Sequence, residues 1–154
     1  MNGKTVKIQI WDTGHEYYKE IRRTYYKGVI GALLVYDITK KETFTNVSKW
    51  LEEIKSNIFQ EIAIILIGNK KELEDKREVS YEEGEALAKE NGFMFFEISA
   101  KIIDEINEVL KKSILFILNN ISNVKLKYEN NNDFEIKLTD YGLAKSYKNN
   151  NIIK

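Results

Sequence analysis

Three short polar clusters each follow an apolar or alternating run of residues, and their side chains could bind one ligand together. They are Asp12, Asn69-Lys70-Lys71-Glu72 and Ser99-Ala100-Lys101. They offer carboxylate, amide, ammonium and backbone N–H groups, which are hydrogen-bonding partners for a polar ligand. Ligands of parallel α/β sheets bind outside the carboxyl ends of the strands. If the preceding runs are parallel strands, the sequence predicts a binding site at their shared edge.

The runs favour a parallel α/β sheet, because strand and helix signals alternate along the chain. Strands are predicted at Thr5–Trp11, Val29–Tyr36, Ile62–Ile67 and Phe93–Ile98. Helices are predicted over Lys40–Asn57, from a Ser80/Glu83 capping box to a stop at Asn91-Gly92, and from Ile102 to about Leu118. Glu16 to Lys27 indicates a loop that leads into a further helix.

Composition argues against several classes of partner. The chain has 154 residues, a net charge of zero and no Cys. A neutral chain has no electrostatic footprint for nucleic acid, so we expect no nucleic-acid partner. The lack of Cys predicts no disulfide, no thiolate metal site and no lipid anchor at a C-terminal Cys, and it fits a cytoplasmic location. The longest apolar run, Val29–Tyr36, is too short to span a bilayer.

The second and third clusters resemble the guanine-recognition elements of small GTPases, Asn-Lys-x-Asp and Ser-Ala-Lys. Guanine presents two adjacent donors, N1–H and the exocyclic amine, which the carboxylate of Glu72 could accept in a fork. The Asn69 amide could meet the N7/O6 edge, the Lys70 stem could lie along the base, and a backbone N–H of Ser99-Ala100-Lys101 could donate to O6. Alone, Asn-Lys-x-Glu would indicate a solvated loop; the order of the motifs favours guanine. Glu72 replaces the family's Asp, and its extra methylene displaces the carboxylate by roughly 1.5 Å.

From about residue 2 to residue 118 the chain resembles the Rab family of Ras-like small GTPases. The matching stretches are Gly3-Lys4-Thr5-Val6-Lys7, Ile10-Trp11-Asp12-Thr13, Tyr25-Tyr26-Lys27-Gly28, Leu34-Val35-Tyr36-Asp37-Ile38-Thr39, and Phe44-Thr45-Asn46-Val47 with Trp50-Leu51. The resemblance implies GTP binding and hydrolysis that regulate vesicle traffic, with Mg²⁺ as cofactor. It also implies that Asp12 faces Mg²⁺ through water and that Trp11 and Tyr26 belong to an effector surface. The alternative for both aromatic residues is ordinary packing beside the sheet.

The family's phosphate-binding elements have no counterpart in this sequence. No Gly-x-x-x-x-Gly-Lys-Ser/Thr occurs, and in the family this loop holds the phosphates and Mg²⁺. The family's Asp-x-x-Gly-Gln-Glu is here Asp12-Thr13-Gly14-His15-Glu16, which is one residue shorter. Gly14 therefore fits the terminal phosphate poorly, and His15 stands in place of the water-positioning Gln. We expect His15 to be a solvated side chain, and guanine nucleotide to bind weakly or not at all.

The fold implied is an incomplete Ras-like sheet of the P-loop NTPase type, with helices on both faces and without the first strand and phosphate loop. We expect a partial Rab-like GTPase domain over residues 1–121 and an Asn-rich C-terminal segment over 122–154. In the family the first strand lies between the strands predicted here at Thr5–Trp11 and Val29–Tyr36. Each of these is therefore expected to lose a neighbour.

The C-terminal segment contains two alternating runs, Val124–Tyr128 and Phe134–Thr139, which predict a β-hairpin around an Asn-rich turn. One hypothesis is that these runs pair with the strands that lack a neighbour and so decide whether the chain folds. The alternative is a detached hairpin, which is marginal in water. Residues 123–145 also weakly resemble the magnesium-binding segment of protein kinases, with Asp140-Tyr141-Gly142 in place of Asp-Phe-Gly. No other kinase motif accompanies it, so kinase activity is not expected; a chance hairpin and a fused gene fragment both explain it.

Three functions stay open at this point. The first is a Rab-like GTPase with a degenerate nucleotide site. The second is a non-enzymatic interaction module that keeps a Rab-like surface without the switch. The third is an incomplete gene product, and a phosphate-loop motif encoded in frame upstream of Met1 would instead restore a complete GTPase.

Overall fold

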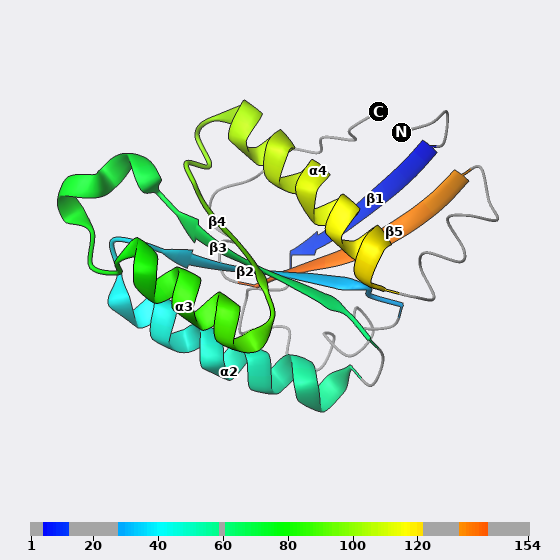
Figure 1. Ribbon diagram of the computed structural model, residues 1–154, viewed down its shortest axis with the longest axis horizontal. Coiled ribbons are helices and arrows are strands. Elements are labelled where there is room, and N and C mark those ends of the chain that lie inside the picture. The colour runs from blue at the N-terminus through cyan, green and yellow to red at the C-terminus, as the bar shows by residue number, and fades with distance from the viewer. Residues whose placement is uncertain (1–4, 13–27, 59–60, 122–132, 142–154) are drawn as a thin grey trace.

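Five parallel strands form one sheet in the computed structural model, which describes residues 5–12, 28–58, 61–121 and 133–141. The strands are β1 (Thr5–Asp12), β2 (Gly31–Asp37), β3 (Ala63–Asn69), β4 (Met94–Ile98) and β5 (Asp133–Tyr141). Helices α2 (Lys41–Asn57) and α3 (Tyr81–Asn91) cover one face, and α4 (Ile103–Asn120) covers the other (Figure 1). A short 3-10 helix, η2 (Lys71–Lys76), follows β3. The predicted α/β class is confirmed.

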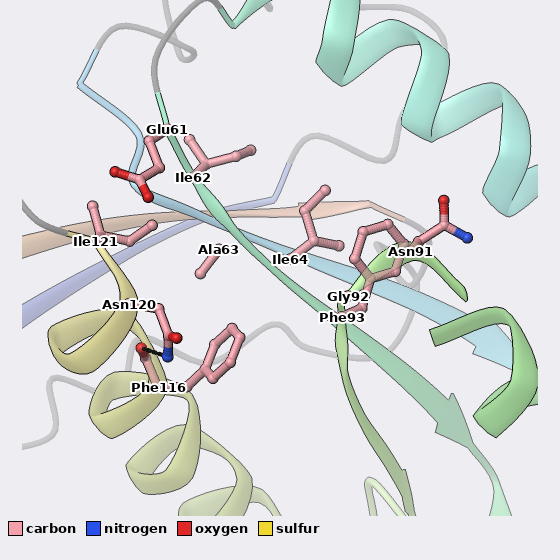
Figure 2. A pocket seen from close by; sticks show the side chains of 10 residues that line it. All are labelled: Glu61, Ile62, Ala63, Ile64, Asn91, Gly92, Phe93, Phe116, Asn120 and Ile121. Atoms are coloured by element: carbon pink, nitrogen blue, oxygen red, sulfur yellow. Dashed lines mark hydrogen bonds between the residues drawn. The ribbon is translucent and has the colours of Figure 1, made fainter. Parts of the chain in front are cut away.

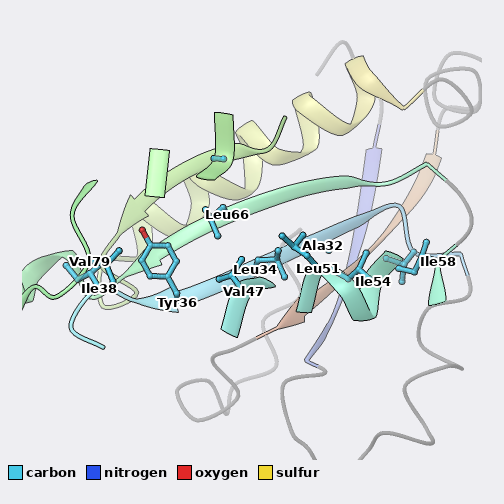
Figure 3. Packing of buried hydrophobic residues seen from close by; sticks show 12 residues of the cluster. Ala32, Leu34, Tyr36, Ile38, Val47, Leu51, Ile54, Ile58, Leu66 and Val79 are labelled. Carbon is cyan, nitrogen blue, oxygen red and sulfur yellow. The ribbon is translucent and has the colours of Figure 1, made fainter. Parts of the chain in front are cut away.

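The central strands are buried on both faces because alternate side chains enter two separate cores. On the α2 side, Leu34 and Tyr36 of β2 pack against Val47 and Leu51 of α2 (Figure 3). The Tyr36 ring lies under α3, where a Cβ on Gly84 would come within 2.4 Å of the tyrosine hydroxyl oxygen. Glycine at this position therefore lets α3 approach the sheet closely.

The second core lies between the sheet and α4. Ile117 of α4 and Ile65 of β3 are fully buried there, together with Ile136 and Leu138 of β5. Val6 and Ile8 of β1 pack against the same cluster. All five strands therefore contribute to the α4 side, and burial of each large side chain there contributes roughly 1.5–3 kcal/mol.

Helix α3 begins and ends where the sequence predicts. The Ser80 side chain accepts from the Glu83 backbone N–H, and the Glu83 carboxylate accepts from the Ser80 N–H at 2.9 Å, which completes the predicted capping box. The helix stops at Gly92, whose φ of 71° is the left-handed conformation that glycine adopts without steric cost. These local signals fix the position of β4, and so the position of the Ser99 turn that follows it.

Strand β5 occupies the place where we expected two strands to lack a neighbour. It pairs in parallel with β1, from Thr5 opposite Asp133 to Asp12 opposite Asp140. It also pairs in parallel with β2, from Gly31 opposite Leu138 to Leu34 opposite Tyr141. The run Phe134–Thr139 thus joins the main sheet, as one hypothesis expected; a detached position for this run is wrong. Its predicted hairpin partner, Val124–Tyr128, lies outside the described residues, as does Glu16–Lys27.

A helix must be both long and apolar to cross a bilayer, and the described α-helices are α2, α3 and α4. None of them combines sufficient length with a sufficiently apolar composition.

Candidate functional site

The carboxyl ends of β2, β3 and β4 meet at one edge of the sheet. Asp37 at the end of β2 lies opposite Asn69 at the end of β3, and Asn69 lies opposite Ile98 at the end of β4. Ser99 follows directly. The structure therefore brings together the two predicted clusters that are 30 residues apart in the sequence, because parallel strands end on the same side.

Asn69 and Ala100 join the two clusters through a direct hydrogen bond. The Ala100 backbone N–H donates to Asn69 Oδ1 over 2.9 Å. Asn69 is 3% exposed and Ser99 is 1% exposed, so the contact lies in a region sheltered from water. The Asn69 amide is thereby oriented with its oxygen toward the Ser99-Ala100-Lys101 turn, and its NH₂ group is the end that could donate to a ligand.

Lys70 turns the chain from β3 into η2 and pairs with a buried carboxylate. Its φ of 70° is uncommon for a residue with a Cβ, and such conformations cluster at functional loops. Its Nζ lies 2.5 Å from Asp37 Oδ2, while Asp37 Oδ1 accepts from the backbone N–H of Thr39 and from its hydroxyl. Burial by itself would raise the pKa of the Asp37 carboxyl, but the hydrogen bonds from Lys70 and Thr39 outweigh it and hold this pKa below its ordinary value.

Glu72 reaches across from η2 to the turn after β4. The hydrogen bond from the Ser99 hydroxyl, together with nearby Lys101, holds the pKa of the Glu72 carboxyl below its ordinary value. Lys101 Nζ lies 3.1 Å from Glu72 Oε1, but the Lys101 side chain is 76% exposed, so this ion pair contributes little to stability. The longer Glu side chain thus contacts the same turn that a guanine-reading carboxylate must approach.

The loop that carries Glu72 is fixed at its far end by Arg77. The Arg77 guanidinium makes two parallel hydrogen bonds of 2.8 Å to the Glu97 carboxylate on β4. The Glu97 side chain is 5% exposed, and a bidentate pair of this kind fixes geometry as well as charge. Both ends of η2 are therefore attached to neighbouring strands.

Glu105 in the first turn of α4 links the two clusters a second time. One carboxylate oxygen accepts from the Ser99 backbone N–H at 2.7 Å, and the other lies 2.7 Å from Lys71 Nζ. Lys71 foremost, and then the Ser99 N–H, hold the pKa of the Glu105 carboxyl below its ordinary value. Glu105 thus orients the Ser99-Ala100-Lys101 turn from the first turn of α4.

The predicted phosphate and magnesium residues are only partly described. Asp12 ends β1 at the same carboxyl edge and is exposed. Gly14, His15 and Tyr26 lie outside the described residues. Mg²⁺ is usually bound by one or two carboxylates together with waters and substrate phosphates. Within the described ranges no group of three His, Asp or Glu residues could hold a metal ion, so the role of Asp12 toward Mg²⁺ stays a prediction.

Trp11, the described member of the predicted effector surface, lies beside Asp12 at the end of β1. Its side chain is 39% exposed. Its membership of an effector surface and its packing beside the sheet both stay predictions.

A cavity of about 310 Å³ lies at the opposite edge of the sheet, between the starts of β3 and β4 and the end of α4. Figure 2 shows Ile64, Phe93, Phe116 and Ile121 among its lining side chains. Its polar lining residues include Glu61 and Asn120. It lies at the amino ends of the strands, away from the described site residues, so it does not extend the site at the carboxyl edge.

Asp37, Glu105 and Arg77 were missed as site residues by the sequence reasoning. Asp37 was noted only within a stretch that resembles the Rab family. Its signal was available, because Asp37 ends an apolar run just as Asn69 does. Glu105 and Arg77 carry no such signal, since exposed helices and loops contain many charged residues.

The sequence model of the Ras family matches residues 1–119. The matched stretch includes β1 to β4 and reaches the last turn of α4, whereas β5 lies beyond it. The residues at the carboxyl edge, from Asp37 to Glu105, all fall inside the match.

Proposed function

The chain belongs to the Ras family of small GTP-binding proteins, and from this premise we propose that its carboxyl edge recognises the guanine base of a nucleotide. One observation carries the proposal. Asn69 at the end of β3, Glu72 of η2 and the Ser99-Ala100-Lys101 turn after β4 are joined by hydrogen bonds into one polar cluster. Such preorganised donors and acceptors bind without the cost of ordering them first.

Each group has a partner on the base. The ionised Glu72 carboxylate would accept from N1–H and the 2-amino group, which adenine does not present in this arrangement. The Asn69 NH₂ group would donate to N7, and a backbone N–H of the turn would donate to O6. Lys101 Nζ would move away from Glu72 to admit the base, which its exposure allows. A site that requires such donors rejects analogues lacking them, because its polar groups are then left unpaired.

We further propose that phosphate binding is weak in these 154 residues. The sequence contains no Gly-x-x-x-x-Gly-Lys-Ser/Thr, whose backbone N–H groups and Lys hold phosphates. Lys70 and Lys101, the lysines of the two motifs, are paired with Asp37 and Glu72. Base contacts would therefore supply most of the affinity, and we expect a dissociation constant above about 1 μM for Mg²⁺-GDP.

Calorimetric titration of the full chain with Mg²⁺-GDP, guanosine and adenosine tests both proposals. We expect weak binding that favours guanosine over adenosine and that is lost in Glu72→Gln. Glu85→Gln, an exposed glutamate of α3, is the matched control. Equal binding of guanosine and adenosine, or no guanosine binding at millimolar concentration, would refute base recognition. Binding of Mg²⁺-GDP tighter than about 1 μM would refute weak phosphate binding.

We also propose that the chain is of the Rab type and acts in the cytoplasm in vesicle traffic, in line with the stretches quoted above. A second candidate function is a Rab-like interaction module that does not switch with nucleotide. Such a module would use Trp11, which is 39% exposed at the end of β1, as part of its contact surface. Binding of a purified Rab effector domain that is equal with GDP, with GTP and without nucleotide, and that falls in Trp11→Ala, would favour the module over the switch.

A further inference from the structure

Strands β1 and β2 are held together by β5 and not by each other. Each is hydrogen-bonded to β5, which lies between them (Figure 1). In the part of the sheet that the structure describes, β5 is the neighbour through which β1 joins the other strands. We call the space between these two strands the β1–β2 slot.

The walls and the occupant of the β1–β2 slot come from different parts of the chain. Both walls lie inside the stretch matched by the Ras family model, which ends at residue 119. The occupant, β5, begins at Asp133, beyond that stretch. The family part thus provides a gap bounded by two strand edges, and the following segment fills it.

Both backbone hydrogen bonds and side-chain packing hold β5 in the β1–β2 slot. The Ile30 N–H donates to the Lys137 carbonyl oxygen over 3.1 Å, in addition to the ladder bonds of β1 and β2. Ile136 and Leu138 are 0% exposed and lie in the core beneath α4. Gly31 leaves room for Leu138, because a Cβ on Gly31 would lie 2.6 Å from Leu138 Cδ2. Strand addition to sheet edges uses the same combination of main-chain bonds and alternate side-chain pockets.

We propose that the β1–β2 slot is a binding site for an extended peptide and that the chain fills it with its own residues 133–141. The ligand runs parallel to both walls and places apolar side chains at the positions of Ile136 and Leu138. The side chain between them, at the position of Lys137, points to the other face of the sheet. This proposal concerns a different site from the guanine-recognising edge and does not rest on the proposed function.

The test cuts the chain before β5 after the full chain has folded. A cleavage sequence for a site-specific protease replaces Asn130–Asn132, which precede β5. After cleavage, the piece that contains β5 should co-elute with the rest of the protein under native conditions and separate in denaturant. A synthetic peptide of residues 132–142 should exchange with it, and added peptide should raise the melting temperature of the cleaved protein.

Variant peptides give the matched comparison. A Leu138→Asp peptide should bind at least about tenfold more weakly, because it would bury a charge in the α4 core. A Lys137→Gln peptide should bind within about twofold of the natural sequence, since the Lys137 side chain is half-buried on the opposite face.

Three outcomes would overturn the proposal. In the first, the cleaved piece leaves while the rest keeps its melting temperature. In the second, the protein unfolds after cleavage, and the added peptide fails to restore the fold. The peptide concentration of about 1 mM is enough to saturate even a weak site. In the third, the Leu138→Asp peptide binds as well as the natural one. If cleavage unfolds the protein, restoration of the fold by the natural peptide, and not by the Leu138→Asp peptide, would support the proposal.

Discussion

Gly31 of β2 and Leu138 of β5 lie directly opposite each other, and the space of a missing Cβ at Gly31 is occupied by the Leu138 side chain. A Cβ there would lie 2.6 Å from Leu138 Cδ2 and 3.0 Å from Ile117 Cδ1 of α4. Leu138 and Ile117 are both fully buried, so neither can move into solvent. The contact therefore fixes how β5 is seated between the sheet and α4.

The first prediction follows from this contact. Gly31→Ala should lower the free energy of unfolding by about 1–3 kcal/mol, because it overpacks a filled core. Leu138→Ala alone should lower it by about 2–5 kcal/mol. In the double variant the two losses should not add, since the shorter side chain leaves room for the new methyl group. Urea unfolding of the natural protein, the two single variants and the double variant measures the coupling between the two positions. Losses of unfolding free energy that add to within about 0.5 kcal/mol would contradict the contact.

The elements were predictable from the sequence wherever a local signal determines them. Periodic apolar residues gave α2 and α4, and the Ser80/Glu83 capping box with Gly92 gave both ends of α3. Strand ends were predicted within two residues because polar clusters follow them. These signals depend on neighbours within a few positions along the chain.

The place of β5 in the main sheet was only one of two hypotheses for this run. Alternation of apolar and polar residues predicts a strand, but it does not predict which strand pairs with it. The run Phe134–Thr139 fits an antiparallel hairpin as well as a parallel place between β1 and β2. Its register with Gly31 depends on side-chain volumes contributed by Ile117 of α4, which is 86 positions away from Gly31 in the sequence (117 − 31). The Lys70–Asp37 pair was likewise not predicted, since two strands had to be placed side by side first.

The second prediction concerns GTP hydrolysis. The full chain should release phosphate from GTP no faster than the uncatalysed reaction. Phosphoryl transfer requires positioned cations and a positioned water, and the described lysines of the motifs are paired with Asp37 and Glu72. His15→Ala should therefore change nothing. A single-turnover assay checks this, and phosphate release that His15→Ala abolishes would show that His15 acts in catalysis.

The third prediction concerns Glu105, which we infer to be a positioning residue for the Ser99-Ala100-Lys101 turn. Glu105→Ala should leave the buried Ser99 N–H without its acceptor, at a cost of about 1–3 kcal/mol. Hydrogen exchange at the Ser99 amide should become faster. Glu105→Gln, which keeps an acceptor oxygen, should preserve most of the protection.

The control for Glu105 is Glu108→Ala, one turn later in α4. Glu108 pairs with Lys112 on the helix surface, and its loss should leave Ser99 exchange unchanged. If Glu105→Ala and Glu108→Ala had the same effect on Ser99, the bond from the Ser99 N–H to Glu105 would not be what orders the turn.

The last prediction concerns acid. The folded protein holds the pKa of the Asp37 carboxyl below its ordinary value, through Lys70 and Thr39 acting against burial. A group with a lowered folded pKa stabilises the protein above its unfolded pKa, about 3.9 for Asp, and loses that contribution as the pH falls toward the folded value. Asp37→Asn removes this titration. The variant should be less stable than the natural protein by about 1–3 kcal/mol at pH 7, because a charged hydrogen-bond network is broken. The difference should narrow below about pH 4.

Urea unfolding from pH 7 to pH 3 measures this difference in stability, with Asp75→Asn, at an exposed carboxylate, as the control variant. A difference between Asp37→Asn and the natural protein that stays constant across this range would mean that Asp37 contributes through packing and not through its charge.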